Sequence, residues 1–155
     1  MEKKIAKGST LLLVLLMAPL LFMDAKPIGM GMPFYHRFLY HFFHVNFLHY
    51  IFNSWCLVSM VFAFDLPLVD ILMAYLIATF VPIVWSASAI GLSGMCFVLL
   101  GRCSFFAKDK RSYHSYIGLF LAIGLVVPTI AGFIHLYCYL VGVAYGLLIH
   151  PFKWQ

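Results

Sequence analysis

Charged side chains are scarce in this 155-residue chain: they make up 10% of the residues, and only five of them are acidic. Hydrophobic residues make up 65%, and the mean hydropathy is +1.01. In an ordinary soluble domain about 25% of the residues are charged. The composition therefore excludes such a domain, and we expect a single integral membrane domain over residues 1–155.

The ten basic residues, which give the chain a net charge of +5, do not form a basic stripe. They lie at the ends of apolar segments, where membrane topology explains them, so we expect no nucleic-acid partner. The sequence also lacks a CxxC pair, and its four cysteines lie within apolar runs. Neither a disulfide framework nor a metal site is indicated, and we expect no cofactor.

Six apolar stretches come close to the roughly 20 residues that a membrane-spanning helix needs. We therefore expect an all-α bundle of six transmembrane helices, at about residues 8–23, 38–64, 66–85, 89–106, 112–127 and 129–150. The lysines and short apolar run at the N-terminus also resemble a secretory signal peptide. Because Met23-Asp24-Ala25 is a poor cleavage site, we expect the first helix to be retained.

The distribution of basic residues predicts the orientation of this bundle. If the N-terminus lies in the cytoplasm, eight of the ten basic residues are cytoplasmic, and only Lys26 and Arg37 lie outside. Cytoplasmic loops of membrane proteins are enriched in lysine and arginine. We therefore expect both termini to be cytoplasmic.

The second apolar stretch contains polar side chains, which cost roughly 1 to several kcal/mol each in hydrocarbon if they are unpaired. His49 and Asn53 are four residues apart, so on a helix they share one face. His44 lies about 140° round the same helix and is expected to face a different neighbour. His41 and Asn46 receive no role from the sequence.

Two further polar side chains are expected at a similar depth, near the outer side. Ser93 lies about one turn into the fourth stretch, in GLSGMCFVLLG, and His135 lies early in the sixth. A lone helical serine usually bonds its own i−4 carbonyl. Beside a histidine, however, a serine forms the minimal nucleophile–base pair for acyl transfer. No acid is expected at this depth, so the pair would act as a dyad, and neither an HExxH motif nor a pair of facing aspartates indicates another membrane protease.

Glycines mark the helices that carry these two side chains. The fourth stretch contains Gly91, Gly94 and Gly101, and Gly142 and Gly146 follow in the last stretch at four-residue spacing. Small residues let a neighbouring helix approach closely. We therefore expect each of these two helices to have a face that packs closely against a neighbour.

Together these residues resemble the rhomboid intramembrane serine proteases. The resemblance depends on HxxxxHxxxN in a second span, GxSG opening a fourth span and a histidine in a sixth, in this order and orientation. The matching residues are His44, His49, Asn53, Gly91, Ser93, Gly94 and His135. Arg37 is similar to the family's basic residue at the end of the first loop, and the similarity covers nearly the whole chain.

The resemblance implies a role for most of these side chains. Ser93 would be the nucleophile and His135 the general base. The oxyanion hole would consist of His49, Asn53 and the backbone N–H of Ser93. Phe97 stands where the family has an aromatic ring that packs on the catalytic histidine. A helix that begins just before Ser93 would direct its positive end at developing negative charge.

Other residues would support the site, and two depart from the family pattern. His44 would brace the first loop, and the glycines beside Ser93 would let other groups approach it. Ile134 stands where the family usually has alanine or glycine, and Cys138 stands where it usually has glycine. Both departures add bulk where the fourth and sixth helices are expected to touch.

On this resemblance we expect a serine endopeptidase of the inner (plasma) membrane of a bacterium, with its active site opening towards the extracytoplasmic side. Its partners would be the lipid bilayer and transmembrane protein substrates with small residues near the scissile bond. One alternative is a catalytically inactive rhomboid-like protein that binds or escorts membrane proteins, but such proteins typically lack a catalytic residue. The other is a redox protein with histidine-ligated haem or copper, which leaves GLSG and Asn53 unexplained.

Overall fold

The computed structural model describes residues 2–24, 27–82, 89–127 and 129–149. Over these residues the chain forms seven α-helices, two short 3₁₀-helices and no β-strand, which confirms the expected all-α class. Their bounds are α1 Glu2–Met17, η1 Ala18–Phe22, α2 His36–Leu39, η2 Tyr40–Phe42, α3 Phe47–Ala63, α4 Leu68–Thr79, α5 Ser93–Cys103, α6 Lys110–Val126 and α7 Gly132–Ile149.

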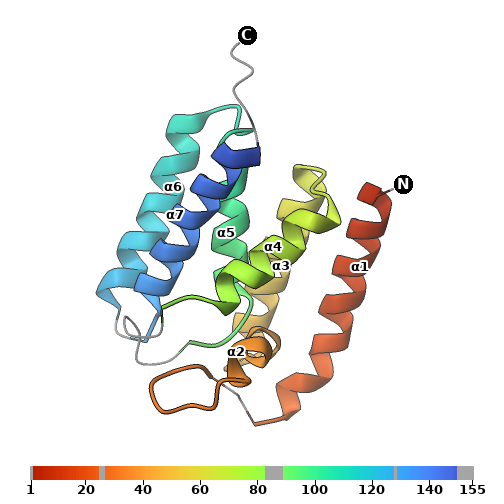
Figure 1. Cartoon of the computed structure of the whole chain (residues 1–155), viewed down its shortest axis with the longest axis vertical. Helices are drawn as coiled ribbons and strands as arrows, with labels where there is room; N and C mark the ends of the chain where they lie inside the picture. Colours follow the sequence, from red (N-terminus) through yellow and green to blue (C-terminus); the bar gives the residue numbers. More distant parts are fainter. Residues whose placement is uncertain (1, 25–26, 83–88, 128, 150–155) are drawn as a thin grey trace.

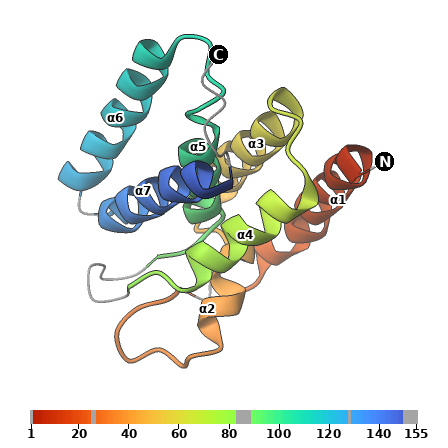
Figure 2. The same cartoon turned by 45° about the horizontal axis from the view of Figure 1, so that its top comes forward.

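Helix α5 lies in the middle of the bundle, and α1 and α6 lie at opposite edges (Figures 1 and 2). Eight of the 11 residues of α5 are buried, and its closest packing is against α7. The starts of α1 and α6 and the end of α5 lie at the upper end of Figure 1. The start of α5, which carries Ser93, therefore points to the opposite end.

Two helical segments, Glu2–Phe22 and Gly132–Ile149, are long and apolar enough to cross a membrane. The pair His36–Phe42 and Phe47–Ala63 adds a third if it is counted as one broken span, although it bends by 93°. With 12 and 11 residues, α4 and α5 are shorter. At about 1.5 Å per residue they fall well short of a hydrocarbon core about 30 Å thick. The six-span arrangement therefore stays a prediction.

The expected single helix over residues 38–64 is wrong, because the chain bends before Phe47. Asn46 has an extended backbone (φ −159°), and its side-chain oxygen accepts a hydrogen bond from the His49 N–H at 2.9 Å. This is helix N-capping, which satisfies a backbone donor that the first turn leaves unpaired. The residues before Asn46 instead form the short helices α2 and η2, which cross the end of the bundle.

Other expected boundaries also shift by a few residues. α1 already begins at Glu2, and α4 ends at Thr79 because Pro82 cannot continue a helix. The expected end of that span at residue 85 lies outside the described residues, as does residue 150. α5 begins only at Ser93, because Gly91 has a φ of +97° that interrupts a right-handed helix. It ends at residue 103 instead of 106, and the last two helices begin at residues 110 and 132 instead of 112 and 129.

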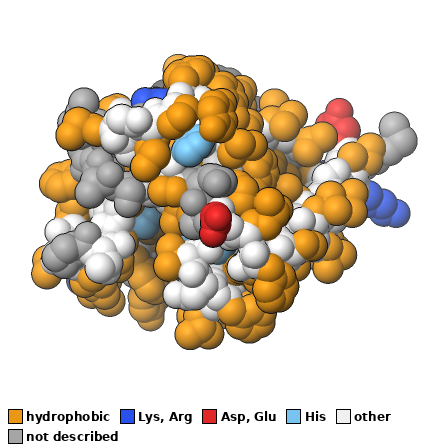
Figure 3. Space-filling model, turned by 90° about the horizontal axis from the view of Figure 1, so that it is seen from below, with side chains coloured by type: hydrophobic (Ala, Val, Ile, Leu, Met, Phe, Trp, Pro, Cys, Tyr) orange, Lys and Arg blue, Asp and Glu red, His pale blue; other side chains and the backbone are white. Residues whose placement is uncertain are grey.

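Apolar side chains cover much of the outside of the bundle. Figure 3 shows the end that carries α2, where hydrophobic side chains predominate and charged ones are few. On the edge helices, Leu15 of α1 is 68% exposed and Phe120 of α6 is 64% exposed. Exposed apolar surface of this extent is unusual for a soluble monomer and suits contact with lipid.

One buried ion pair joins three helices at the end opposite α2. Asp70 of α4 lies 3.3 Å from Arg102 of α5 and accepts a hydrogen bond from the Tyr145 hydroxyl of α7 at 2.9 Å. The Asp70 side chain is only 1% exposed. Asp70 is thus buried in the first turn of α4. The pair ties α4 and α7 to the helix that carries Ser93.

Candidate active site

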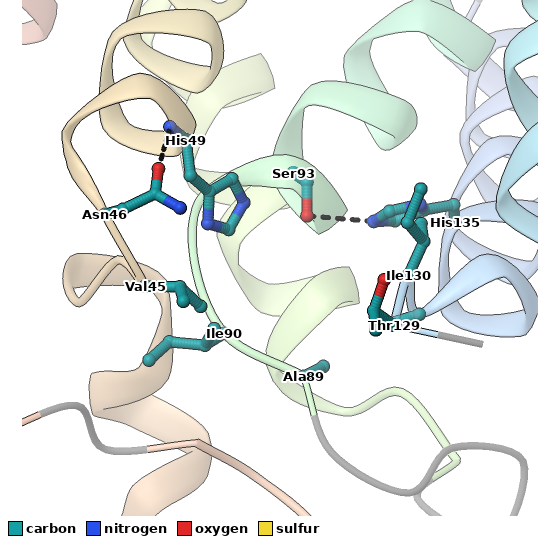
Figure 4. A pocket seen from close by; sticks show the side chains of 10 residues that line it. Val45, Asn46, His49, Ala89, Ile90, Ser93, Thr129, Ile130 and His135 are labelled. Atoms are coloured by element: carbon teal, nitrogen blue, oxygen red, sulfur yellow. Dashed lines mark hydrogen bonds between the residues drawn. The ribbon is translucent and has the colours of Figure 1, made fainter. Parts of the chain in front are cut away.

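Ser93 and His135 come together although 42 positions separate them in the chain. Ser93 is the first residue of α5, and His135 lies in the first turn of α7. The Ser93 Oγ lies 2.9 Å from the His135 Nε2, within hydrogen-bond distance (Figure 4). At the first position of α5, rather than one turn in, the Ser93 backbone N–H has no intrahelical acceptor and is free to bind another group.

An aromatic ring holds the imidazole of His135 in place. Phe97, one turn after Ser93 on α5, stacks on His135 with ring centroids 4.5 Å apart and an interplanar angle of 18°. Such a contact opposes rotation of the imidazole. It therefore keeps the Nε2 directed at the Ser93 hydroxyl.

Two glycines, further along α5 and α7 than Ser93 and His135, let the backbones of these helices touch. A Cβ atom on Gly101 would lie 2.7 Å from the backbone nitrogen of Val143. A Cβ atom on Gly142 would lie 2.9 Å from the Val98 Cα. Both distances are too short for any side chain, so glycine at these positions sets the separation of the helices.

The bulk of Ile134 and Cys138 does not keep the two helices apart. Both side chains are fully buried, at 2% and 0% exposure. A Cβ atom on Gly94 would lie 3.6 Å from the Cys138 Sγ, an ordinary van der Waals distance, so the thiol fits between the helices without crowding α5. The departures from the family pattern are therefore compatible with a short distance between Ser93 and His135.

A glycine turn brings the chain before Ser93 against His49 and Asn53. A Cβ atom on Gly91 would lie only 3.0 Å from both the Asn53 Nδ2 and the His49 Cε1. Together with the positive φ, this packing requires glycine at the position. The Nδ2 of Asn53 is buried and has no hydrogen-bond partner. The predicted pair on one face of α3 is thus next to the loop that leads into Ser93.

His44 lies elsewhere than the sequence suggested. It precedes α3 instead of lying on it, and its ring meets that of His49 edge-on, with centroids 5.2 Å apart. The expectation that His44 faces a different neighbour is therefore wrong, because the chain bends at Asn46. Both ring nitrogens of His44 are buried without a partner. The capping role of Asn46 could have been found from the sequence, since asparagine is a preferred residue before a helix.

The segment of α2 and η2 holds the loop before Ser93 in place. The Arg37 guanidinium donates hydrogen bonds to the carbonyls of Thr79 and Val81, at 3.2 and 2.9 Å. The carbonyl of Tyr40 accepts a hydrogen bond from the Gly91 N–H at 2.8 Å. Arg37 matches the position that the resemblance singled out, but no local pattern indicated Tyr40. Its partner lies far along the chain.

Two further contacts complete this support. Ile28 and Ala89 exchange two backbone hydrogen bonds of 2.9 Å, which join the first long loop to the loop before α5. His41, which the sequence left without a role, is buried with its Nε2 3.1 Å from the Thr79 hydroxyl. The approach to Ser93 is therefore braced from two sides by residues 28–41.

An open cavity of about 360 Å³ leads to the dyad. His49 and the Ser93–His135 pair lie on opposite sides of it in Figure 4, and apolar side chains surround its opening. The lining residues are Val45, Asn46, His49, Ala89, Ile90, Ser93, Thr129, Ile130, Ala131 and His135. A short piece of extended chain fits such a space, and its carbonyl could lie between the serine hydroxyl and the histidine of α3.

Within the described residues, His135 has a hydrogen bond to Ser93 and none to a carboxylate. The buried acid, Asp70, pairs with Arg102 at the other end of α5. No group of three or more His, Cys, Asp or Glu side chains in the described part of the chain could hold a metal ion. The arrangement thus brings a serine, a base and the His49 imidazole to one cavity, whereas the Asn53 amide is buried beside it.

The comparisons with known proteins leave the family of the chain open. No protein-family model, no curated protein and no solved structure matches it. The resemblance to the rhomboid proteases therefore depends on its motifs and on the geometry around Ser93 and His135.

Proposed function

We propose that this chain is an intramembrane serine endopeptidase of the rhomboid type, which hydrolyses peptide bonds in or near the transmembrane segments of membrane proteins. The observation that supports it most is the 2.9 Å hydrogen bond between the Ser93 Oγ and the His135 Nε2. Both residues of this hydrogen bond line a cavity that His49 also lines. A serine paired with a base can act as a nucleophile towards a peptide carbonyl.

We also propose that six helices, α1 and α3 to α7, lie in the inner membrane. Both termini would lie in the cytoplasm, and the dyad would lie towards the outer side. The two long apolar helices and the basic residues at the end opposite α2 support this orientation. Because α5 begins at Ser93, non-helical backbone reaches the depth of the dyad. Such backbone is tolerated in a membrane where it lines a cavity, and the cavity would bring water to the site.

In the first half of the reaction the Ser93 Oγ attacks the scissile carbonyl carbon, and the hydroxyl proton passes to the His135 Nε2. The carbonyl oxygen takes the electron pair of the π bond and becomes an oxyanion. When the carbonyl re-forms, the C–N bond breaks and the Nε2 proton passes to the leaving amine. This step leaves an acyl ester on Ser93.

In the second half a water molecule attacks the ester carbonyl and gives a proton to the His135 Nε2. The C–O bond to Ser93 then breaks, and the proton returns to the serine oxygen. The products are a carboxylate and an amine, and the dyad is regenerated. His135 thus acts as a base and then as an acid in each half.

In this proposal three donors would stabilise the oxyanion. They are the backbone N–H of Ser93 at the start of α5, the His49 imidazole and the unpaired Asn53 Nδ2. Preorganised donors in a site with little water stabilise the transition state without reorganising. A buried amide with no partner costs free energy when empty, which supports a role for Asn53 in binding.

The variant Asn53→Ala is expected to cleave more slowly without losing all activity. Loss of one oxyanion donor costs about 2.7–4 kcal/mol, which is about 10²- to 10³-fold in kcat. His49 and the Ser93 N–H would remain, so the loss stays smaller than that of Ser93→Ala. The measurement is kcat for a transmembrane substrate in proteoliposomes. Complete loss in folded Asn53→Ala, equal to that of Ser93→Ala, would contradict the role of a single donor.

Covalent labelling with a fluorophosphonate, a probe for activated serines, tests the proposed function directly. We expect the wild-type protein to be labelled in detergent, and Ser93→Ala to lose all labelling. The matched control is Ser104→Ala at the end of the same helix, where the hydroxyl only bonds the Gly101 carbonyl at 2.8 Å. This variant keeps its labelling.

Two results would overturn the proposal. Labelling that persists in Ser93→Ala would show that another residue reacts. A folded wild-type protein that the probe does not label would instead favour the inactive escort of membrane proteins.

A further inference from the structure

A second cavity, of about 680 Å³, opens at the end of the bundle opposite the dyad. It lies between the start of α1, the end of α3 and the start of α6, which run on either side of α5 (Figure 2). The residues that line it are Lys3, Ala63, Phe64, Asp65, Phe106, Ala107, Lys108, Asp109, Ser112, Tyr113 and Tyr116. None of them takes part in the proposed proteolysis. We refer to this cavity as the basal groove.

Each of the two acids of the basal groove already has a hydrogen-bond partner. The Lys7 ammonium donates a hydrogen bond to Asp65 at 2.5 Å and lowers the pKa of its carboxyl group. Asp109 caps α6: its carboxylate accepts from the Ser112 N–H at 3.1 Å and from the Ser112 hydroxyl at 2.6 Å. The Ser112 hydroxyl is the main cause of the lowered pKa of Asp109. Asp65 is therefore paired with a cation, whereas Asp109 remains an anion that is held by hydrogen bonds.

The two lysines of the basal groove form no such short contact, although the charge of Lys3 contributes to the lowered pKa of Asp65. Within the described residues, no ion pair or hydrogen bond joins Lys3 or Lys108 to a carboxylate. Lys110 and Arg111 follow in the first turn of α6, close in sequence to Lys108. The two lysines and two acids of the lining balance, and Lys7, Lys110 and Arg111 next to the groove give this end of the bundle an excess of positive charge, which is complementary to an anion.

The remaining wall of the groove is aromatic. Phe64 and Phe106 lie beside the lysines, and Tyr113 and Tyr116 extend the wall along α6. Tyr116 is 66% exposed on the outside of the bundle. Tyrosines are enriched where a membrane protein passes from hydrocarbon to the headgroups. A ligand that fits both walls has an anionic head and an apolar tail.

The groove is poorly suited to a free phosphate ion. Helix N-termini commonly bind phosphate through their unpaired N–H groups. At the start of α6 the Asp109 carboxylate already accepts from the Ser112 N–H, so this N–H is not available to a free phosphate. Long lysine side chains at the membrane surface instead suit a headgroup whose acyl chains lie in the bilayer.

We propose that the basal groove binds one anionic phospholipid, with Lys3 and Lys108 at its phosphate and the aromatic wall along its glycerol and upper acyl chains. The site goes beyond the proposed protease activity. It depends only on this end of the chain lying at a membrane surface, which the cytoplasmic leaflet would provide. The lipid would join α1 and α3 to α6, an edge helix that packs mainly against α7.

Native mass spectrometry of the full chain in detergent tests this site with phosphatidylglycerol and phosphatidylcholine as probes. We expect one phosphatidylglycerol to stay bound in preference to phosphatidylcholine. The double variant Lys3→Gln/Lys108→Gln is expected to lower the affinity for phosphatidylglycerol about thirtyfold, or about fivefold for each lysine. Higher salt lowers the affinity of the wild type as well.

The matched control is Lys4→Gln/Lys110→Gln, which removes the same charge from the same end of the bundle at residues that do not line the groove. It is expected to keep the affinity within a few-fold of wild type. An equal loss in both double variants would overturn the site and indicate a diffuse surface charge. Binding without preference for phosphatidylglycerol, or unaltered binding in Lys3→Gln/Lys108→Gln, would overturn it too. Displacement of the lipid by excess inorganic phosphate would indicate a free-anion site instead.

Lipid binding and proteolysis can be separated by experiment. The exposed lysines are far from the dyad, so the variants are expected to react with the fluorophosphonate probe like the wild type. If the protein binds the lipid but is never labelled, the proposed lipid site stands and only the proposed protease function is wrong. If the protein is labelled but does not bind the lipid, the proposed lipid site is wrong and the proposed protease function stands.

Discussion

Ser93→Ala, His135→Ala and the double variant are expected to lose peptide-bond cleavage to the same extent. The serine Oγ and the histidine Nε2 share one hydrogen bond of 2.9 Å. The proposed attack on a carbonyl needs both atoms, because the oxygen attacks while the nitrogen accepts its proton. Residues that act as one unit show losses that do not add. We expect a drop in kcat on the order of 10⁴- to 10⁶-fold for each single variant, and no further drop for the pair.

The measurement combines cleavage of a transmembrane substrate in proteoliposomes with thermal unfolding. Both side chains are half-buried at the cavity, so alanine at either position removes little packing and the Tm is expected to change by only a few degrees. Phe97 would lose its stacking partner in His135→Ala, which makes this variant the less stable of the two.

The double variant makes this test specific to a dyad. If Ser93 and His135 acted independently, the losses of the two single variants would multiply. A double variant far less active than either single variant would therefore contradict a shared proton transfer. Substantial activity in His135→Ala would show that another group takes the proton from Ser93.

Gly142→Ala is expected to abolish both activity and probe labelling, although Gly142 lies two turns away from His135. Its Cβ atom would lie within 2.9 Å of the Val98 Cα, and main-chain atoms of α5 have no room to move aside. The two helices would have to separate or tilt. A displacement of about 1 Å at a catalytic pair can cost about 10²-fold in rate.

Gly101→Ala is expected to act in the same way from the other helix, because its Cβ atom would lie 2.7 Å from the Val143 nitrogen. Overpacking of this kind usually costs about 1–3 kcal/mol of stability. The loss of probe labelling should exceed the loss expected from the unfolded fraction alone. Denaturation in mixed micelles gives the stability, and the rate of fluorophosphonate labelling gives the state of the dyad.

Gly118→Ala is the matched control for both substitutions. Gly118 lies within α6, and a Cβ atom there would meet nothing within 4 Å. Alanine favours a helix over glycine by roughly 0.5–1 kcal/mol, so stability should stay the same or rise. Wild-type labelling and stability in Gly142→Ala would show that the helices can separate without harm, and the proposed role of the glycines would be wrong.

Much of the fold followed from composition and from patterns within a few residues. The scarcity of charge indicated a membrane protein, and the long apolar runs indicated helices. Both inferences follow from the medium, lipid or water, that surrounds each segment. The exact helix starts did not follow in this way. Asn46 and Gly91 interrupt apolar runs that a hydropathy pattern cannot divide, since a single cap or a single positive φ decides the boundary.

The candidate site was accessible from the sequence only in part. The spacing of His49 and Asn53 placed them on one face, and the glycines of α5 and α7 indicated close packing. The contact of His44 with His49 and the support of Gly91 by Tyr40 were not indicated. The basal groove was not indicated either, because it is built from three chain segments whose residues carry no shared motif.

The residue types, their periodicity and their charges determined an all-α chain rich in apolar surface, and they singled out Ser93 and His135 as candidates. Whether these two side chains meet was decided by tertiary structure alone. Helix periodicity relates residues three or four positions apart, whereas the hydrogen bond of the dyad joins residues 42 positions apart. That bond depends on the direct contact of two helix backbones at Gly101 and Gly142, and on a loop that Tyr40 and Ile28 hold in place.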